Sequence, residues 1–137
     1  MIEFKYAKGN GIPDIPIIYI ALYVKNRRIG GPALVDTGFD GGIYPNRYLY
    51  DYLSKFKLKS DKEEMLADVT GMIKCKMLDI RAEIFDPNSD IRYSLGRVNV
   101  YFPERKRYVS NNVIVGREIL NNLDIRLNGR ILRVKKD

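Results

Sequence analysis

Short runs of β-branched and aromatic residues, separated by turn-forming residues, dominate the first part of the chain. Runs of this composition and length are typical of β-strands. Three of them cover residues 2–6, 15–24 and 29–35. Near the other end, Asn128 and Gly129 stand between two segments that alternate apolar and polar residues, which is a strong local indication of a β-hairpin. The pattern therefore predicts a mostly β chain.

A short helix is expected after these strands. Asn46 can cap a helix over residues 47–56, where apolar residues recur at helical spacing. The spacing and aromatic character of this stripe indicate packing against a core. Its members are Tyr48, Leu49, Tyr52, Leu53 and Phe56.

A long hairpin is expected in the middle of the chain. Residues 65–70 and 72–85 are rich in apolar residues and flank Gly71, which would lie near the tip. A further strand is expected over residues 91–102, and a second short helix over residues 117–123. The predicted fold class is therefore all-β with one or two short helices.

Length and composition indicate one ordinary globular domain over residues 1–137. The chain has 137 residues, of which 45% are apolar and 30% are charged. A chain of this size can bury a core without disulfide support. No apolar run is long enough to span a membrane, and Glu3 and Lys5 interrupt the first residues, where a signal peptide would be apolar. We therefore expect a cytoplasmic protein.

Two features of the composition narrow the possible chemistry. The sequence contains no histidine and a single cysteine, Cys75. Without histidine, neither a Ser-His-Asp triad nor a Cys-His pair can form, and histidine-bound zinc is excluded. Catalysis by carboxylates alone needs neither residue type, so the composition favours acid–base chemistry. No cofactor and no metal are expected.

The best candidate carboxylate is Asp36, which with Thr37 and Gly38 directly follows an apolar run. A strand that ends here would deliver the acid into a tight turn. Thr37 offers a hydroxyl that can tie the turn down, and Gly38 allows a sharp turn or a close approach to a substrate. These three residues are the predicted catalytic residues.

A second segment, residues 113–120, is again an apolar run that ends in a glycine, Gly116, and enters a short helix. Together with the Asp-Thr-Gly tripeptide, this segment resembles the retropepsin-type aspartic proteases, in particular their bacterial and archaeal single-domain members. The resemblance covers residues 33–45 and 113–134. It implies a closed β-barrel of the retropepsin (acid protease) type and an endopeptidase that hydrolyses peptide bonds.

The single Asp-Thr-Gly makes this activity depend on a dimer. Hydrolysis needs one group that takes a proton from water and another that donates one. The sequence holds one such tripeptide, so the second carboxylate must come from another chain. A two-fold homodimer would place Asp36 beside its symmetry mate. In the family, the pair shares a proton and activates a water, and the threonine, here Thr37, hydrogen-bonds across the axis.

The resemblance also assigns the residues around the pair. Gly116 and Arg117 would support the loop, and Asp40 and Arg117 occupy positions that form an ion pair in many retropepsins. If both charges were partly buried, the loss of one would cost about 3 to 5 kcal/mol. The hairpin would close as a flap over an extended peptide or unfolded protein. The substrate would contact Phe39, Asp40, Thr70, Gly71 and Met72.

Three other interpretations are open. A calcium loop could use Asp36 and Asp40, but Gly38 and Arg47 stand where its third and twelfth ligands belong. A formal charge of +7 is compatible with nucleic acid, but the basic residues are scattered without a nucleic-acid-binding motif, which favours a solvated surface. The main alternative is a dimeric binding module with the retropepsin fold and no proteolytic activity, because fold does not determine function.

Overall fold

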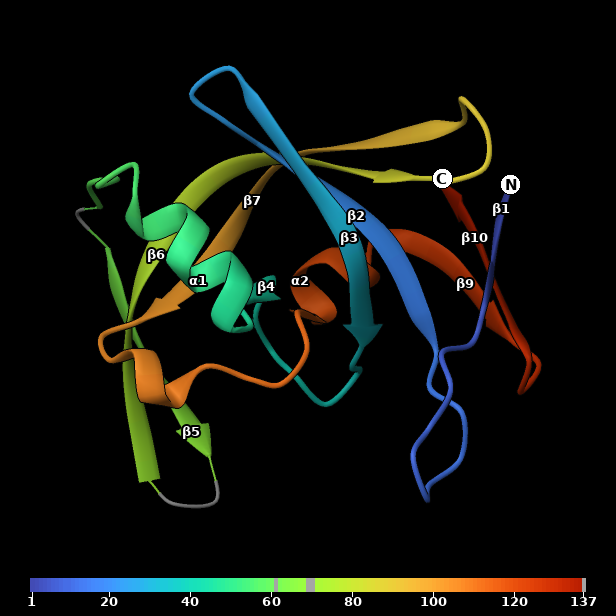
Figure 1. The fold of residues 1–137 in the computed structure, drawn as a ribbon, viewed down its shortest axis with the longest axis horizontal. Helices are drawn as coiled ribbons and strands as arrows, with labels where there is room; N and C mark the ends of the chain where they lie inside the picture. Colours follow the sequence, from blue (N-terminus) through green and yellow to red (C-terminus); the bar gives the residue numbers. More distant parts are fainter. Residues whose placement is uncertain (61, 69–70, 137) are drawn as a thin grey trace.

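The structure is a computed structural model that describes residues 1–60, 62–68 and 71–136. It is mostly β with few helices, as the sequence predicts (Figure 1). The strands are β1 (Ile2–Lys5), β2 (Ile17–Val24), β3 (Arg27–Val35), β4 (Ile43–Tyr44), β5 (Glu63–Asp68), β6 (Gly71–Phe85), β7 (Arg92–Pro103), β8 (Ile114–Val115), β9 (Leu123–Leu127) and β10 (Ile131–Lys136). The helices are α1 (Arg47–Ser54), the 3-10 helix η1 (Lys106–Tyr108) and α2 (Arg117–Leu120).

The strands form two sheets. The smaller sheet is antiparallel, in the order β1-β10-β9, and the start of β1 pairs with the end of β10 through Ile2 and Val134. The larger sheet has the order β2-β3-β8-β4-β7-β6-β5. In addition, β2 pairs with β6 from Ile20 to Tyr23, so over this stretch β2 has hydrogen-bonded neighbours on both sides.

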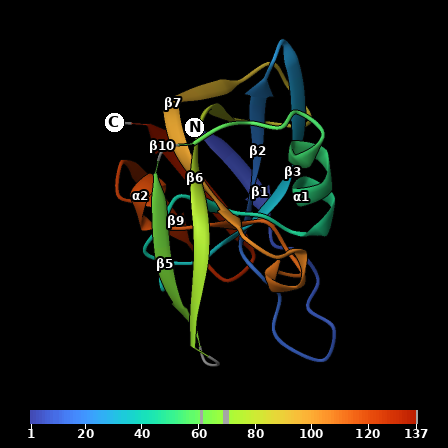
Figure 2. The ribbon, with the colours of Figure 1, turned by 90° about the vertical axis from the view of Figure 1, so that its left-hand side faces the viewer.

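Both sheets contribute to one apolar core. Ile2 and Leu132 come from the smaller sheet, and Ile18, Ile84 and Val100 come from the larger one; all five are buried and belong to the same cluster. Along β1 and much of β6, buried and exposed residues alternate, as the two-residue period of a strand requires. In the view of Figure 2, α1 and α2 lie on either side of β6 and β7.

Two tight connections follow from local sequence. Lys25 and Asn26 both have positive φ, 48° and 66°, which suits a two-residue turn between β2 and β3. The predicted hairpin at the other end is confirmed as β9 and β10. There the Asn128 side chain accepts hydrogen bonds from the backbone N–H groups of Arg130 and Ile131, at 3.0 and 2.9 Å.

Both helices end earlier than predicted. α1 ends at Ser54 instead of residue 56, because Lys57 has a φ of 47° in the left-handed region, where a right-handed helix cannot continue. α2 ends at Leu120 instead of residue 123. The reason is long-range, since Leu123 is already part of β9 and pairs with Lys136 of β10.

The predicted apolar stripe of α1 is confirmed in part. Leu49 and Leu53 are buried, and Tyr52 and Phe56 are partly buried against the core. Tyr48 was expected in the same stripe but is 71% exposed. The stripe that faces the core is therefore narrower than the spacing of the apolar residues indicates.

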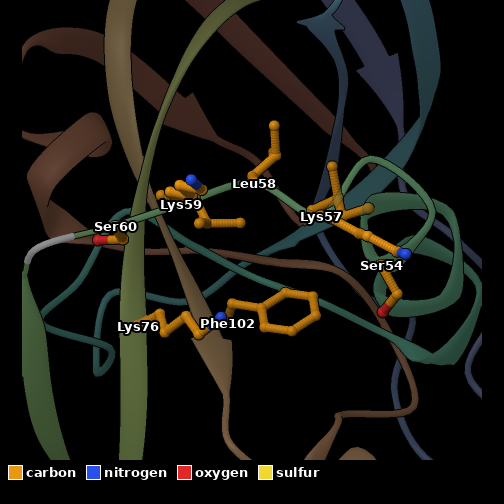
Figure 3. A pocket seen from close by; sticks show the side chains of 9 residues that line it. Ser54, Lys57, Leu58, Lys59, Ser60, Lys76 and Phe102 are labelled. Atoms are coloured by element: carbon orange, nitrogen blue, oxygen red, sulfur yellow. The ribbon is translucent and has the colours of Figure 1, made fainter.

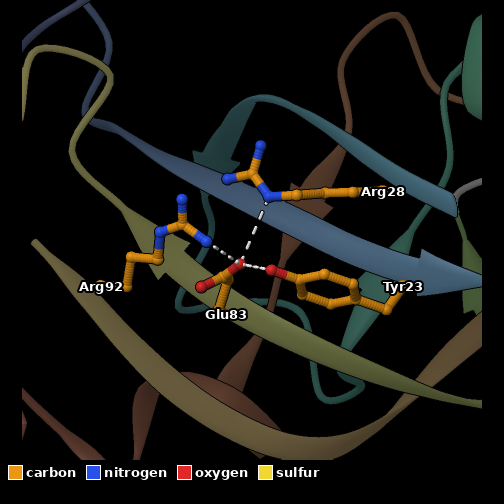
Figure 4. A network of polar contacts seen from close by, with 4 residues as sticks. All are labelled: Tyr23, Arg28, Glu83 and Arg92. Carbon is orange, nitrogen blue, oxygen red and sulfur yellow. Dashed lines mark hydrogen bonds and ion pairs between the residues drawn. The ribbon is translucent and has the colours of Figure 1, made fainter. Parts of the chain in front are cut away.

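A buried carboxylate joins four strands at the place where β2 meets β6 (Figure 4). Glu83 of β6 is 7% exposed and accepts a hydrogen bond from the Tyr23 hydroxyl of β2. Its Oε1 also lies 3.3 Å from Nε of Arg28 in β3 and 3.8 Å from Nη1 of Arg92 in β7. A buried charge is tolerated when it is paired in this way. We assign the cluster to the stability of the strand pairing.

Candidate active site

Asp36 directly follows the last residue of β3, and its backbone is held on both sides. Its N–H donates to the carbonyl of Val115 at 3.0 Å, and its own carbonyl accepts from the N–H of Phe39 at 3.2 Å. The first bond extends the parallel pairing of β3 with β8, in which Val35 lies opposite Val115. The strand pair therefore determines where Asp36 leaves the sheet. We call residues 36–42 the aspartate loop.

The Asp36 carboxylate is partly exposed and turned back onto its own loop. Oδ1 accepts a hydrogen bond from the N–H of Gly38 at 2.9 Å, which is an Asx turn. Within the described residues, Oδ2 has no hydrogen-bond partner. One oxygen is thus held by the turn, and the other is open to solvent or to a second molecule.

Thr37 is exposed at the outside of this turn. Its hydroxyl has no hydrogen-bond partner in the part of the chain that the structure describes. A local bond from the hydroxyl to the backbone, one of the two roles considered for Thr, is therefore not seen within one chain. The role across a dimer axis stays a prediction.

The start of α2 holds the aspartate loop through backbone contacts. The N–H of Gly116 donates to the carbonyl of Gly42 at 2.8 Å, and the N–H of Arg117 donates to the carbonyl of Phe39 at 2.9 Å. A Cβ on Gly116 would lie 2.4 Å from the carbonyl oxygen of Gly41 and 2.5 Å from that of Phe39. Only glycine allows this approach, so the contact of Gly116 with the loop has a steric reason.

Asp40 and Arg117 form an ion pair, as the resemblance implies. The condition for a large energetic cost, partial burial of both charges, is not met, because 78% of the Asp40 side chain and 49% of the Arg117 side chain are exposed. A solvent-exposed pair of this kind contributes about 0 to 1 kcal/mol, well below the value for a buried pair. The pair also places a cationic side chain on one of the two carboxylates that the calcium-loop interpretation would need.

Phe39 was predicted to contact the substrate, but its side chain packs against the interior of the protein. Its ring packs edge-on against Tyr44 and Tyr101, with centroid distances of 6.1 and 5.8 Å. It is partly buried against a second apolar cluster that contains Ile73 and Cys75. In the structure Phe39 therefore anchors the aspartate loop to the interior.

The predicted hairpin is present as β5 and β6, with residue 68 opposite Gly71. Gly71 opens β6 with a φ of 141°, and the next residue, Met72, is 59% exposed. Thr70, the third predicted flap residue, lies outside the described residues. The half of the hairpin nearer its tip connects to the aspartate loop indirectly, since the paired residues Leu66 and Ile73 pack in the same cluster as Phe39.

Two residues beside the loop were not predicted from the sequence. The Tyr101 hydroxyl donates to Oε2 of Glu118 at 2.6 Å, and the N–H of Glu118 donates to the carbonyl of Gly41 at 3.2 Å. Burial, followed by the hydrogen bond to Glu118, raises the pKa of Tyr101 well above its usual range. Tyr101 therefore stays a neutral donor. No local sequence pattern indicates these residues, because β7 and α2 lie far from the aspartate loop in the sequence and meet it only in the folded chain.

Asp36 is partly exposed in the single chain. Five pockets with volumes of about 230 to 610 Å³ are lined by other parts of the described chain, and none of the five is lined by Asp36.

Among the described residues, no group of three or more acidic, cysteine or histidine side chains is arranged to hold a metal. None of the described helices has the length and apolar character needed to cross a bilayer.

No model of a known protein family matches the chain, and no curated protein matches it. Among solved structures, the chain is similar to a crystal structure of a retropepsin-like aspartic protease from Rickettsia conorii. The match covers 98% of this chain and 99% of that chain, with 18% sequence identity and a TM-score of 0.49. A likeness at this level assigns neither a family nor an activity to the chain.

Proposed function

We propose that the chain is one subunit of a homodimeric aspartic endopeptidase, with a single retropepsin-like domain over residues 1–137. One observation carries the proposal: Asp36 presents a partly exposed carboxylate at the end of a paired strand, on a loop that is held by close backbone contacts with Gly116. The pairing of β2 with both β3 and β6 supports the closed barrel that the resemblance implies.

The proposed reaction uses the Asp36 side chains of two subunits across a two-fold axis. Two carboxylates about 3 Å apart cannot both ionise easily, so they share one proton. The ionised Asp36 takes a proton from a water, and the water attacks the scissile carbonyl. The protonated Asp36 donates to the carbonyl oxygen, which gives a tetrahedral diol. The Asp36 that took the proton from water then passes it to the leaving nitrogen as the C–N bond breaks, the other Asp36 takes a proton from the diol, and no covalent intermediate with the enzyme forms. Thr37 would hydrogen-bond across the axis and hold the two loops at a fixed separation.

The proposed substrate is an extended peptide or an unfolded protein. A strand-like substrate can bind along a cleft through its main chain, so that side-chain pockets select the sequence. The second subunit would supply the other wall of this cleft, which the open surface at Asp36 lacks. Met72 of the β5–β6 hairpin is 59% exposed, and β5 and the loop that follows β3 both lie in the lower half of Figure 1.

Asp36→Asn tests the assignment directly. The variant keeps an oxygen that can accept from the Gly38 N–H but cannot act as an acid or a base. We expect cleavage of an unstructured protein, assayed from acidic to neutral pH, to fall by about 10²- to 10⁴-fold. Pepstatin should inhibit the wild-type protein.

The matched control is Asp90→Asn, which makes the same chemical change at an exposed residue between β6 and β7. We expect this variant to cleave at the wild-type rate. Equal cleavage by the wild-type and Asp36→Asn proteins would refute the proposal. A dimer that binds peptides but cuts none of them would instead support the non-proteolytic module.

A further inference from the structure

A second candidate site lies away from the aspartate loop, between the end of α1 and strands β6 and β7 (Figure 3). It is a pocket of about 580 Å³, within the size range of small-molecule sites. Three lysines line it. Lys57 and Lys59 belong to the connection that follows α1, and Lys76 belongs to β6 and runs alongside Phe102 in Figure 3.

The lysines of this pocket are unpaired among the residues that the structure describes, which do not include Asp61. Within the described residues, none of the three lysines has an ion-pair partner, and no acidic residue lines the pocket. Two other lysines form ion pairs. Nζ of Lys74 lies 3.3 Å from Oε2 of Glu63, and Nζ of Lys106 lies 2.7 Å from Oδ1 of Asp51. Lysines without ion-pair partners around one pocket favour an anionic ligand.

Lys57 occupies a backbone position that suits glycine. Its φ of 47° lies in the left-handed region, and its N–H donates to the carbonyl of Ser54 at 3.3 Å as the chain leaves α1. Glycine usually stands at this position after a helix, because a Cβ makes the left-handed conformation unfavourable. The chain therefore holds a lysine at the rim of the pocket in spite of a backbone cost.

The pocket wall is held by hydrogen bonds. The Ser60 hydroxyl donates to the carbonyl of Met77 at 2.5 Å, and the N–H of Met77 donates to the carbonyl of Lys62 at 3.0 Å. These bonds fasten the connection after α1 to β6. The second serine of the pocket, Ser54, donates to the carbonyl of Tyr50 at 2.7 Å. Both hydroxyl protons are thus engaged within the protein.

The floor of the pocket is apolar and includes an aromatic ring. Leu53, Leu78 and Phe102 line it. The Phe102 ring is stacked on Tyr50, with centroids 4.2 Å apart and an angle of 9° between the planes. Aromatic rings at such a floor favour a further planar ring by stacking or edge contact. The pocket therefore combines an apolar surface for a ring with cations for an anionic group.

We propose that this pocket binds a small planar anion of nucleotide size, with its ring against Phe102 and its phosphate among Lys57, Lys59 and Lys76. The proposal does not depend on the activity proposed for Asp36. Isothermal titration of the full chain with ADP, adenosine and inorganic pyrophosphate tests it. We expect one equivalent of ADP to bind, and adenosine and pyrophosphate each to bind at least about tenfold more weakly, because each offers one half of the contacts.

Charge-matched variants separate a built site from general attraction to a basic protein. Lys57→Ala with Lys76→Ala should weaken ADP binding at least about tenfold. Lys8→Ala with Lys135→Ala removes the same charge from exposed residues outside the pocket and should leave ADP binding unchanged. Equal losses in the two double variants would overturn the proposal. So would a failure of ADP to saturate the protein, or pyrophosphate binding as tight as that of ADP.

Lys57→Gly separates the binding role from a folding role. Glycine relieves the left-handed backbone, so the melting temperature should equal or exceed that of the wild type. ADP binding should nevertheless weaken. A variant that keeps full affinity for ADP would contradict the role of Lys57 at the rim. Phe102→Leu should weaken ADP more than pyrophosphate, and equal effects on both ligands would contradict the stacking contact.

Discussion

At the scale of single residues, the position of the aspartate loop depends on Gly116 having no side chain. The loop and the start of α2 approach so closely that three backbone hydrogen bonds form between them, donated by the N–H groups of Gly116, Arg117 and Glu118. The backbone of Gly116 is extended, with a φ of −109°, so its conformation would suit any residue. Residues with a side chain are excluded at this position because the neighbouring backbone carbonyls occupy the space that a Cβ would need.

Gly116→Ala should therefore lower the free energy of unfolding, by about 1 to 3 kcal/mol, as overpacking of a closed site does. Gly31→Ala is the matched control, because a Cβ at Gly31 would meet no atom within 4 Å. We expect that variant to unfold within about 0.5 kcal/mol of wild type. Chemical denaturation measures both, and equal effects would show that the contact at Gly116 can relax.

Cys75 predicts a pH dependence of stability. Burial raises the pKa of its thiol from the ordinary 9.0 to about 11, because the thiolate is disfavoured in the core. The unfolded chain then ionises first, so the free energy of unfolding should fall as pH rises from about 9 to about 11. Cys75→Ala should reduce this slope between pH 9 and 10, below the ordinary pKa of tyrosine. An unchanged slope in denaturation curves would contradict the assignment.

At the scale of elements, the local ends of helices and strands follow from a few side chains. α1 begins where Asn46 accepts the N–H of Leu49 at 2.9 Å, and it ends before the left-handed Lys57. The β9–β10 hairpin likewise depends on Asn128, whose side chain holds the turn. These contacts span at most a few residues, which is why the sequence alone indicates them.

Asn46→Ala removes the cap of α1 and should lower the free energy of unfolding by about 1 kcal/mol. Asn46→Asp keeps an acceptor for the Leu49 N–H and should cost less than half as much. Thermal or chemical denaturation compares the two variants. If the aspartate variant loses as much as the alanine variant, the side-chain bond to Leu49 does not account for the stability of the helix start.

At the scale of the whole molecule, the proposed activity requires an assembly. A single chain offers one Asp36 at an open surface, whereas acid and base catalysis together need two carboxylates. Each subunit carries a formal charge of +7, so two subunits repel one another at long range and must be held by close contact. Acidic or neutral peptides should approach such an assembly more readily than basic ones.

Mixing wild-type chains with Asp36→Asn chains tests the shared site. If subunits exchange and each active site needs two intact aspartates, an equal mixture should retain about one quarter of the activity of wild type at the same total concentration. An active site within one chain would retain about one half. Activity assays after equilibration distinguish the two, and dilution of the wild type should lower its specific activity as dimers dissociate.

Much of the fold could be predicted, and less of the site. The mostly β character, the two hairpins and the cap at Asn46 depend on neighbours in sequence. The contact of Gly116 with the aspartate loop was inferred from a resemblance. Tyr101 and Glu118 could not be predicted, because strand pairing brings them to the loop and local patterns do not report pairing between distant strands. The predicted end of α2 was wrong for the same reason, since Leu123 belongs to β9 and pairs with β10.

By itself, the sequence determined that the chain is rich in strands and that Asp36 follows a strand in a turn made by Thr37 and Gly38. These features depend on backbone preferences and on neighbouring residues. Only the tertiary structure decided that Phe39 packs inward, that the Asp40–Arg117 pair is exposed, and that distant lysines line one pocket. Exposure and proximity depend on how segments far apart in the chain pack together, and no stretch of local sequence contains that information.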